Sequence, residues 1–179
     1  MTQPGVSVVM ALMNGQPYLA EALESLVSQT MPPLEIVVVD GGSTDGSDDV
    51  ARSFEPVNLV RQESEGIAGA WNEGIAAARG ELLTFLDSDD RLLPDAIAKG
   101  VALLEQRPEI EMSIGRVRYF LEPGFGHPPG FRPELLEGDH FGALPGGMIT
   151  RRSVFERAGL FDQGYSIASD VEWLSLIHI

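Results

Sequence analysis

The sequence predicts an α/β fold in which a mostly parallel, twisted sheet is flanked by helices. Short apolar runs, loops and segments with helical periodicity follow one another repeatedly, an order typical of βα units. Residues 34–39 are apolar at almost every position, as expected for a strand that helices cover on both faces. The length of 179 residues and the hydrophobic content of 44% fit one globular domain.

Four strand and helix pairs are expected before residue 107. The strands are predicted at 6–10, 34–39, 57–61 and 82–86. The helices are predicted around Leu19 to Val27, around Val50 to Phe54, over 67–79 and over 94–106. In the first helix Leu19, Leu23 and Leu26 share one face. Residues 110–121 are predicted to be extended, and 152–158 to form a further helix.

Residues 123–147 are predicted to form a long loop. They hold five of the twelve prolines and seven of the twenty glycines, a composition that disfavours both helix and central strand. Loops of this length inside a domain are usually functional. We therefore expect a lid or a substrate-facing segment here.

The charge and the residue types exclude several functions. With 12 basic and 27 acidic residues the formal net charge is −15, so nucleic acid is an unfavourable partner. The absence of cysteine excludes disulfides, thiolate ligands and a cysteine nucleophile. The three histidines, at 127, 140 and 178, lack metal-binding spacing.

The two ends of the chain suggest a cytoplasmic fragment. The first residues resemble neither a signal peptide nor a membrane span, so we expect a cytoplasmic protein without a spanning segment, with peripheral association at the inner face of the membrane left open. Residues 175–179 resemble a translated sequencing adapter. We therefore expect one domain that is incomplete at its C-terminus, with a donor-binding half at 1–121 and a partial acceptor half at 122–179.

Two acidic loops follow predicted strands, at the sheet edge where α/β proteins bind ligands. Asp87 and Asp89 are two residues apart and could both reach one divalent cation; the alternative is a polar turn that caps the next helix. The loop that begins at Asp40 could accommodate a ribose or a base, or could simply be a βα turn. It is not a dinucleotide fingerprint, because Ser43 stands where glycine is required.

Two further polar residues are candidates with open alternatives. Asn72 lies on a helix rich in small residues and is either a surface side chain or a hydrogen-bonding contact. Its neighbour Trp71 is expected in the core. Asp170 is either a helix-start acid or a general base for an acceptor hydroxyl.

Taken in order, these motifs resemble the inverting family 2 glycosyltransferases with the GT-A fold, the fold of nucleotide-diphospho-sugar transferases. The likeness covers nearly the whole chain. It is carried by the following segments: Val6-Ser7-Val8-Val9 with Asn14, Val37-Val38-Val39-Asp40-Gly41-Gly42-Ser43-Thr44-Asp45-Gly46, Asn72-Glu73-Gly74-Ile75, Leu86-Asp87-Ser88-Asp89-Asp90, Arg151-Arg152-Ser153-Val154-Phe155 and Gly159-Leu160-Phe161-Asp162.

The resemblance implies a role for each candidate. Asp89 and Asp87 would hold Mn²⁺ or Mg²⁺ against the diphosphate of a nucleotide sugar, with a UDP-sugar as the expected donor. Asp170 would deprotonate the acceptor, a saccharide or a lipid-linked saccharide of a bacterial polysaccharide or glycolipid. The remaining residues expected at the donor are Ala11, Asn14, Asp40, Gly66 and Asn72.

The sequence departs from the family at Gly41, where a second aspartate often contacts the base, and at Ala11 and Met13, where a Pro and Tyr pattern is usual. Two alternatives remain open. One is a fragment that binds a sugar nucleotide without turnover. The other, a phosphatase of the haloacid dehalogenase type, is disfavoured because its D-x-D motif belongs on the first strand.

Overall fold

A computed structural model describes residues 4–122, 124–127, 129–141 and 145–165 of the chain. Its centre is a six-stranded sheet with the order β3-β2-β1-β4-β8-β5. The strands are β1 Val6–Leu12, β2 Glu35–Asp40, β3 Val57–Arg61, β4 Leu82–Phe85, β5 Met112–Ile114 and β8 Met148–Arg151. The strands β1 to β4 are parallel, and β8 runs antiparallel between β4 and β5. This confirms the predicted mostly parallel α/β sheet.

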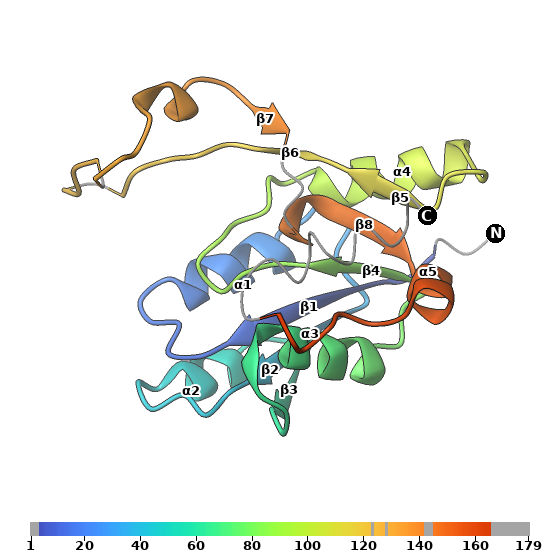
Figure 1. The fold of residues 1–179 in the computed structure, drawn as a ribbon, viewed down its shortest axis with the longest axis horizontal. Coiled ribbons are helices and arrows are strands. Elements are labelled where there is room, and N and C mark those ends of the chain that lie inside the picture. The colour runs from blue at the N-terminus through green and yellow to red at the C-terminus, as the bar shows by residue number, and fades with distance from the viewer. Residues whose placement is uncertain (1–3, 123, 128, 142–144, 166–179) are drawn as a thin grey trace.

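Helices cover both faces of the sheet (Figure 1). They are α1 Leu19–Val27, α2 Ser47–Arg52, α3 Gly66–Ala77, α4 Ala96–Gln106 and α5 Arg152–Ala158. One buried cluster joins Val8 and Met10 of β1 to α1, α2 and α4. The other joins Val9 of β1 to α3 and α5. Alternate residues of one strand thus enter two cores, which explains why β2 is apolar without a polar face.

The predicted elements agree closely with the observed ones. The strand at 57–61 and the helix at 152–158 have the predicted bounds, and the helix predicted at 67–79 lies at Gly66–Ala77. The helix predicted at 94–106 begins later, at Ala96, and no side chain caps its first turn. Strand β8 was not predicted.

The segment expected to be a long loop projects from the body of the molecule (Figure 1). Strands β6 Arg116–Val117 and β7 His140–Phe141 pair at its base, and the 3₁₀ helices Pro133–Leu136 and Pro145–Gly147 interrupt it. Exposed aromatic side chains are frequent on this arm, among them Phe120, Phe125 and Phe141.

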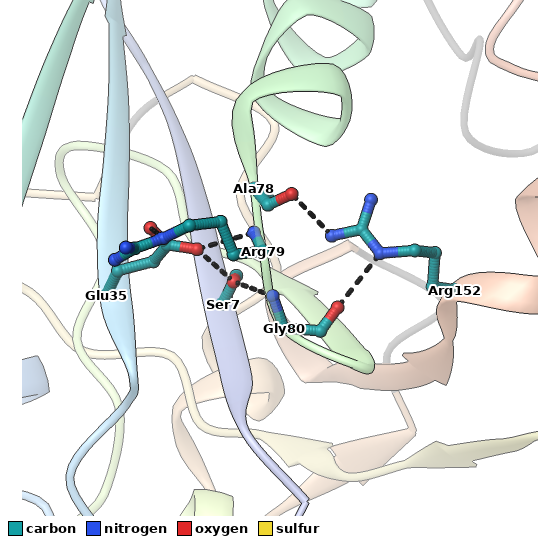
Figure 2. Close-up of polar contacts among 6 residues, drawn as sticks. All are labelled: Ser7, Glu35, Ala78, Arg79, Gly80 and Arg152. Atoms are coloured by element: carbon teal, nitrogen blue, oxygen red, sulfur yellow. Dashed lines mark hydrogen bonds and ion pairs between the residues drawn. The ribbon is translucent and has the colours of Figure 1, made fainter.

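At the sheet edge where β1 and β2 begin, a polar network fastens the turn between α3 and β4 (Figure 2). The buried Glu35 carboxylate accepts hydrogen bonds from the Ser7 hydroxyl, at 2.7 Å, and from the Arg79 backbone N–H, at 2.6 Å. Arg152 donates to the carbonyl oxygens of Ala78 and Gly80. The network therefore joins β1, β2, α3 and α5 at the edge opposite the predicted site.

Among the described residues, no helix combines the length and the apolar character that crossing a membrane requires.

Candidate functional site

The sheet topology creates a crevice at the carboxyl ends of β1 to β4. The chain proceeds from β1 outward to β2 and β3, and then returns to place β4 on the other side of β1. In open α/β sheets ligands bind where the strand order reverses in this way. The two acidic loops predicted from the sequence follow β2 and β4, so both lie at this edge.

A pocket of about 450 Å³ lies over the ends of β1, β2 and β3, within the range of small-molecule sites. We call it the β1–β3 pocket. It is lined by Ala11, Leu12, Met13, Gly41, Gln62, Ser64, Glu65, Gly66, Ile67 and Ala70. Its walls include two exposed apolar side chains, Met13 and Ile67, which are 68% and 40% exposed. Ala11 and Gly66, both expected at the donor, are among the lining residues.

The loops after β1 and β2 are joined by reciprocal hydrogen bonds. Three successive backbone N–H groups, those of Asn14, Gly15 and Gln16, donate to side-chain oxygens of Ser43, Ser47 and Asp45. In return, Asn14 Oδ1 accepts from the backbone N–H of Thr44 at 2.9 Å. Asn14 adopts a positive φ of 54°, a conformation that asparagine tolerates better than most residues. The structure thus gives Asn14 a role in fixing loop shape.

The aspartates of the β2 loop also form internal contacts. Asp40 Oδ1 accepts from the backbone N–H and the hydroxyl of Ser43, at 3.0 and 2.6 Å. Asp45 accepts from the Ser47 hydroxyl at 2.6 Å, and this bond with those from backbone N–H groups lowers the pKa of Asp45. Both carboxylates therefore fix the shape of the loop after β2, and Gly41 of this loop lines the β1–β3 pocket.

A third loop, between β3 and α3, is fastened by Glu73. Its carboxylate accepts from the Ser64 hydroxyl at 2.6 Å, from the Ser64 N–H at 2.7 Å and from the Glu63 N–H at 3.1 Å. The bonds from Ser64 lower the pKa of Glu73. Since Ser64 lines the β1–β3 pocket, Glu73 holds one of its walls in place.

The acidic loop, residues 87–90, begins just after β4, with Leu86 between the two. Its turn is closed by a hydrogen bond from the Asp90 N–H to the Asp87 carbonyl oxygen at 3.1 Å. Desolvation and the neighbouring Asp89 charge raise the pKa of Asp90. A Cβ placed on Gly15 would lie 3.4 Å from Ser88 Cβ. The loop after β1 therefore lines the β1–β3 pocket at Met13 and lies next to the acidic loop at Gly15.

The carboxylates of the acidic loop suit a cation that is coordinated partly by the protein and partly by a ligand. Asp87 and Asp89 are both exposed and supply the hard oxygen donors that Mg²⁺ and Mn²⁺ prefer. Within the described ranges, no group of three acidic or histidine side chains could hold a metal alone. The cation would therefore need further oxygen ligands, which a diphosphate provides.

Asn72, which was expected at the donor, does not line the β1–β3 pocket. Asn72 is 9% exposed and its amide is bonded to Phe161: Nδ2 donates to the carbonyl oxygen at 2.8 Å, and Oδ1 accepts from the N–H at 3.0 Å. Its donor-binding assignment thus gains no support, and its neighbour Trp71 is buried, as predicted. Asp170 lies outside the described residues, as does His178.

Several lining residues escaped the prediction from sequence. Gln62, Ser64 and Glu65 lie in the loop after β3, and Ile67 and Ala70 lie in the first turns of α3. The strand at 57–61 was predicted, so its carboxyl end marked this loop as a candidate. What the sequence did not show was that β3 lies on the same side of β1 as β2.

With this geometry in view, the comparison with known families identifies the chain. The family model described as Glycosyl transferase family 2 matches residues 7–164. The chain therefore belongs to this family. Its structural neighbours are GT-A fold glycosyltransferases, which confirms the fold that the resemblance implied.

Particular relatives are similar over part of their length. Glycosyltransferase GlyG of Streptococcus pneumoniae serotype 4 is 41% identical over 90 residues, which are 48% of this chain and 30% of GlyG. The crystal structure of S. aureus TarS 1-349 in complex with UDP-GlcNAc has a TM-score of 0.74 at 22% identity, covering 96% of this chain and 52% of that one.

A mannosyltransferase, PcManGT from Pyrobaculum calidifontis in complex with GDP-Man and Mn²⁺, has a TM-score of 0.67 at 26% identity. The match covers 90% of this chain and 48% of PcManGT. The chain thus spans between about a third and about half the length of these relatives.

Proposed function

We propose that this chain is the donor-binding part of an inverting glycosyltransferase, which moves a sugar from a nucleotide-diphosphate sugar to a hydroxyl acceptor. The observation that carries the proposal is that the loop after β1, next to the strand-order reversal, lines the β1–β3 pocket at Met13 and lies against the acidic loop at Gly15. A pocket with apolar walls and polar edges suits a base and its ribose. The nearby carboxylates suit the metal-bound diphosphate that follows the ribose.

The charge of the protein supports a requirement for a cation. A net charge of −15 repels a diphosphate, and Arg91, which follows the acidic loop, is already paired with Glu21 at 2.7 Å and Glu122 at 2.6 Å. We therefore assign Asp87 and Asp89 to Mn²⁺ or Mg²⁺. When bound, this ion would neutralise the negative charge that develops on the leaving diphosphate.

The chain's own residues would divide the remaining work. The β1–β3 pocket would hold the base and ribose, with Ala11 and Gly66 in its lining, while Asn14 and Asp40 keep the adjoining loops in shape. Asp170 is proposed as the general base that takes the proton of the acceptor hydroxyl on the face opposite the diphosphate. Attack from that face inverts the anomeric centre.

The acceptor is proposed from the family resemblance as a saccharide or lipid-linked saccharide of the bacterial cell envelope. Such an acceptor would place the enzyme in the cytoplasm or at the inner face of the membrane. The projecting arm, with its exposed aromatic side chains, is the described segment best suited to contact a sugar ring. Holding acceptor and donor in line would then supply part of the rate enhancement.

Thermal unfolding of the purified chain with UDP, GDP, CDP or TDP tests the donor site, each with and without Mn²⁺. A ligand present at 100 times its Kd stabilises the folded state by about 2.7 kcal/mol, so we expect one nucleotide to raise the Tm in the presence of the ion. Asp89→Asn should abolish the shift, whereas Asp49→Asn, on the exposed face of α2, should retain it. A cooperative melt that no nucleotide shifts contradicts the proposal.

A transfer assay separates the enzyme from a fragment that binds without turnover. Asp170→Asn should abolish transfer while the metal-dependent donor shift remains. Nucleotide binding in a wild-type chain that transfers no sugar to any acceptor tested would favour the inactive fragment.

A further inference from the structure

We propose that Gln62 reads the base of the donor through its carbonyl oxygen and selects a pyrimidine that presents an N–H between two carbonyls, as uracil does. The inference rests on the proposed function and names the base that the β1–β3 pocket takes. It starts from the orientation of a single amide. Gln62 Nε2 donates to the Gly66 carbonyl oxygen at 2.8 Å, and a carbonyl oxygen only accepts. The amide therefore keeps its N–H₂ toward Gly66 and turns Oε1 away from it.

The Gln62 carbonyl oxygen faces the part of the pocket that Gly41 leaves open. A Cβ placed on Gly41 would lie 3.0 Å from Gln62 Oε1, and both residues line the pocket. Among the described residues no donor is bonded to this oxygen, although the side chain is half-buried. An acceptor in such a position is ready to accept from a ligand.

The backbone that carries Gln62 is held before any ligand arrives. The Gln62 N–H donates to the Asp40 carbonyl oxygen at 2.9 Å, which extends the pairing of β2 with β3 by one bond. The next two residues, Glu63 and Ser64, donate their N–H groups to the Glu73 carboxylate. The acceptor is therefore fixed by the bonds around it, and a fixed group discriminates better than one that can rotate to suit each ligand.

The surroundings of this oxygen suit a flat ring with a polar edge. The exposed apolar side chains of Met13 and Ile67 border the same pocket and can contact the faces of a ring. Uracil offers N3–H to an acceptor at this position. Cytosine has a lone pair at N3, which a carbonyl oxygen repels, and must shift in the pocket to present its N4–H₂ instead. The Gln62 amide can turn its N–H₂ toward the N3 of cytosine only by breaking its hydrogen bond to the Gly66 carbonyl oxygen. We therefore expect it to bind uracil more tightly than cytosine.

Isothermal titration of UDP and CDP against the chain in the presence of Mn²⁺ tests the inference. We expect the wild type to bind UDP about 10 to 100 times more tightly than CDP, the range that one polar contact commonly supplies. In Gln62→Met, which keeps the length and removes the amide, the ratio of the two affinities should approach one. Gln106→Met makes the same chemical change at the exposed end of α4 and should leave the ratio at its wild-type value.

Gly41→Ala is a second variant that removes no polar group. The added methyl would press on Gln62 Oε1 and lies 3.6 Å from Met13 Sδ, so the UDP preference should fall while circular dichroism shows an unchanged fold. An unchanged affinity ratio in a folded Gln62→Met, or a wild type that binds UDP and CDP equally, overturns the inference and leaves the proposed function standing. Failure of every nucleoside diphosphate to bind overturns the proposed function and, with it, the inference.

Discussion

At the scale of single residues, Asn72 shows how a motif side chain serves the fold. Its amide bonds to both backbone groups of Phe161, so α3 is tied to the segment that leads toward Asp170. Phe161 packs against Trp71 and Phe85, with ring centroids 5.0 and 5.5 Å apart. Asn72 therefore positions an aromatic core beside β4.

Replacing Asn72 with alanine should destabilise the protein rather than weaken donor binding directly. The change leaves two buried backbone groups of Phe161 without their partner, and each unsatisfied group costs about 1–3 kcal/mol. Urea unfolding should show a loss of about 2–4 kcal/mol, whereas Asn58→Ala on the exposed side of β3 should change stability by less than about 0.5 kcal/mol. If Asn72→Ala kept full stability but lost nucleotide affinity, Asn72 would instead be a donor-binding residue.

Glu35 is a second residue whose structural role is not evident from the sequence. It is the one charged residue at the start of an apolar strand, and its side chain is only 2% exposed. Burial by itself raises the pKa of the Glu35 carboxyl, but the hydrogen bonds from Ser7 and Arg79 outweigh it and lower the pKa below its ordinary 4.5. A carboxyl whose pKa is lower in the folded state stabilises the fold above the unfolded pKa. That contribution disappears as pH falls through the lower, folded value.

The stability of the wild type should therefore exceed that of Glu35→Gln at neutral pH and approach it as pH falls below 4.5. Since the amide can accept fewer bonds and turns an N–H₂ toward donors, we expect a difference of about 1–3 kcal/mol at pH 7. Urea unfolding at several pH values measures it. Glu105→Gln, on the exposed face of α4, should change the stability at pH 7 by less than about 0.5 kcal/mol. A difference for Glu35→Gln that stays constant with pH would refute the linkage.

At the scale of elements, one arginine completes the end of α3. The last carbonyl groups of a helix have no partner within it. Arg152 donates to the carbonyl oxygens of Ile75 in the last turn, of the C-cap residue Ala78 and of Gly80 in the turn that follows, at 3.0, 2.8 and 2.9 Å. Its positive charge also lies where the helix dipole favours a cation. Figure 2 shows the guanidinium reaching two of these oxygens from the start of α5.

Arg152→Lys should destabilise the fold, because an ammonium group cannot span three carbonyl oxygens in the plane of a guanidinium. We expect a loss of about 1–3 kcal/mol, measured as a lower midpoint of urea unfolding at an unchanged slope. Arg157→Lys lies on the same helix, where its ion pair with Glu111 is exposed, and should lose less than about 1 kcal/mol. Equal effects of the two changes would contradict the capping role.

The elements that sequence patterns predicted well are those determined by local periodicity. Short apolar runs, helical periodicity and the glycines and prolines between them predicted β1 to β4 and α1 to α5 to within a few residues. Strand β8 was missed because it is only four residues long, too short to show an alternation of apolar and polar residues. Its partners β4 and β5 also lie far away in the chain. Within the site, the strand ends marked the acidic loops. The shared wall made by Gln62 and Gly41 depends on a pairing of β2 with β3 that the sequence does not reveal.

At the scale of the whole molecule, the sheet joins parts of the chain that were expected to divide the work. Residues 1–121 contribute β1 to β5 to the sheet, yet β8 lies between β4 and β5 and hydrogen-bonds to both. Helix α5 follows β8 at once, and its Phe155 packs against Phe85 of β4 at 6.0 Å between ring centroids. The acidic loop after β4 is therefore supported by residues from beyond the projecting arm.

This topology predicts that residues 1–121 cannot fold alone, even though they contain the β1–β3 pocket and the acidic loop. Without β8, strand β5 has no neighbour in the sheet and β4 presents a free edge, while Phe85 and Leu83 lose the cover of α5 and Phe161. A chain of residues 1–121 should show no cooperative transition in urea, whereas a chain of residues 1–165, which keeps every strand of the sheet, should unfold in one step with a slope that matches its size. A sigmoidal, two-state curve for residues 1–121 would show instead that the donor half is an independent folding unit that does not need β8 or α5.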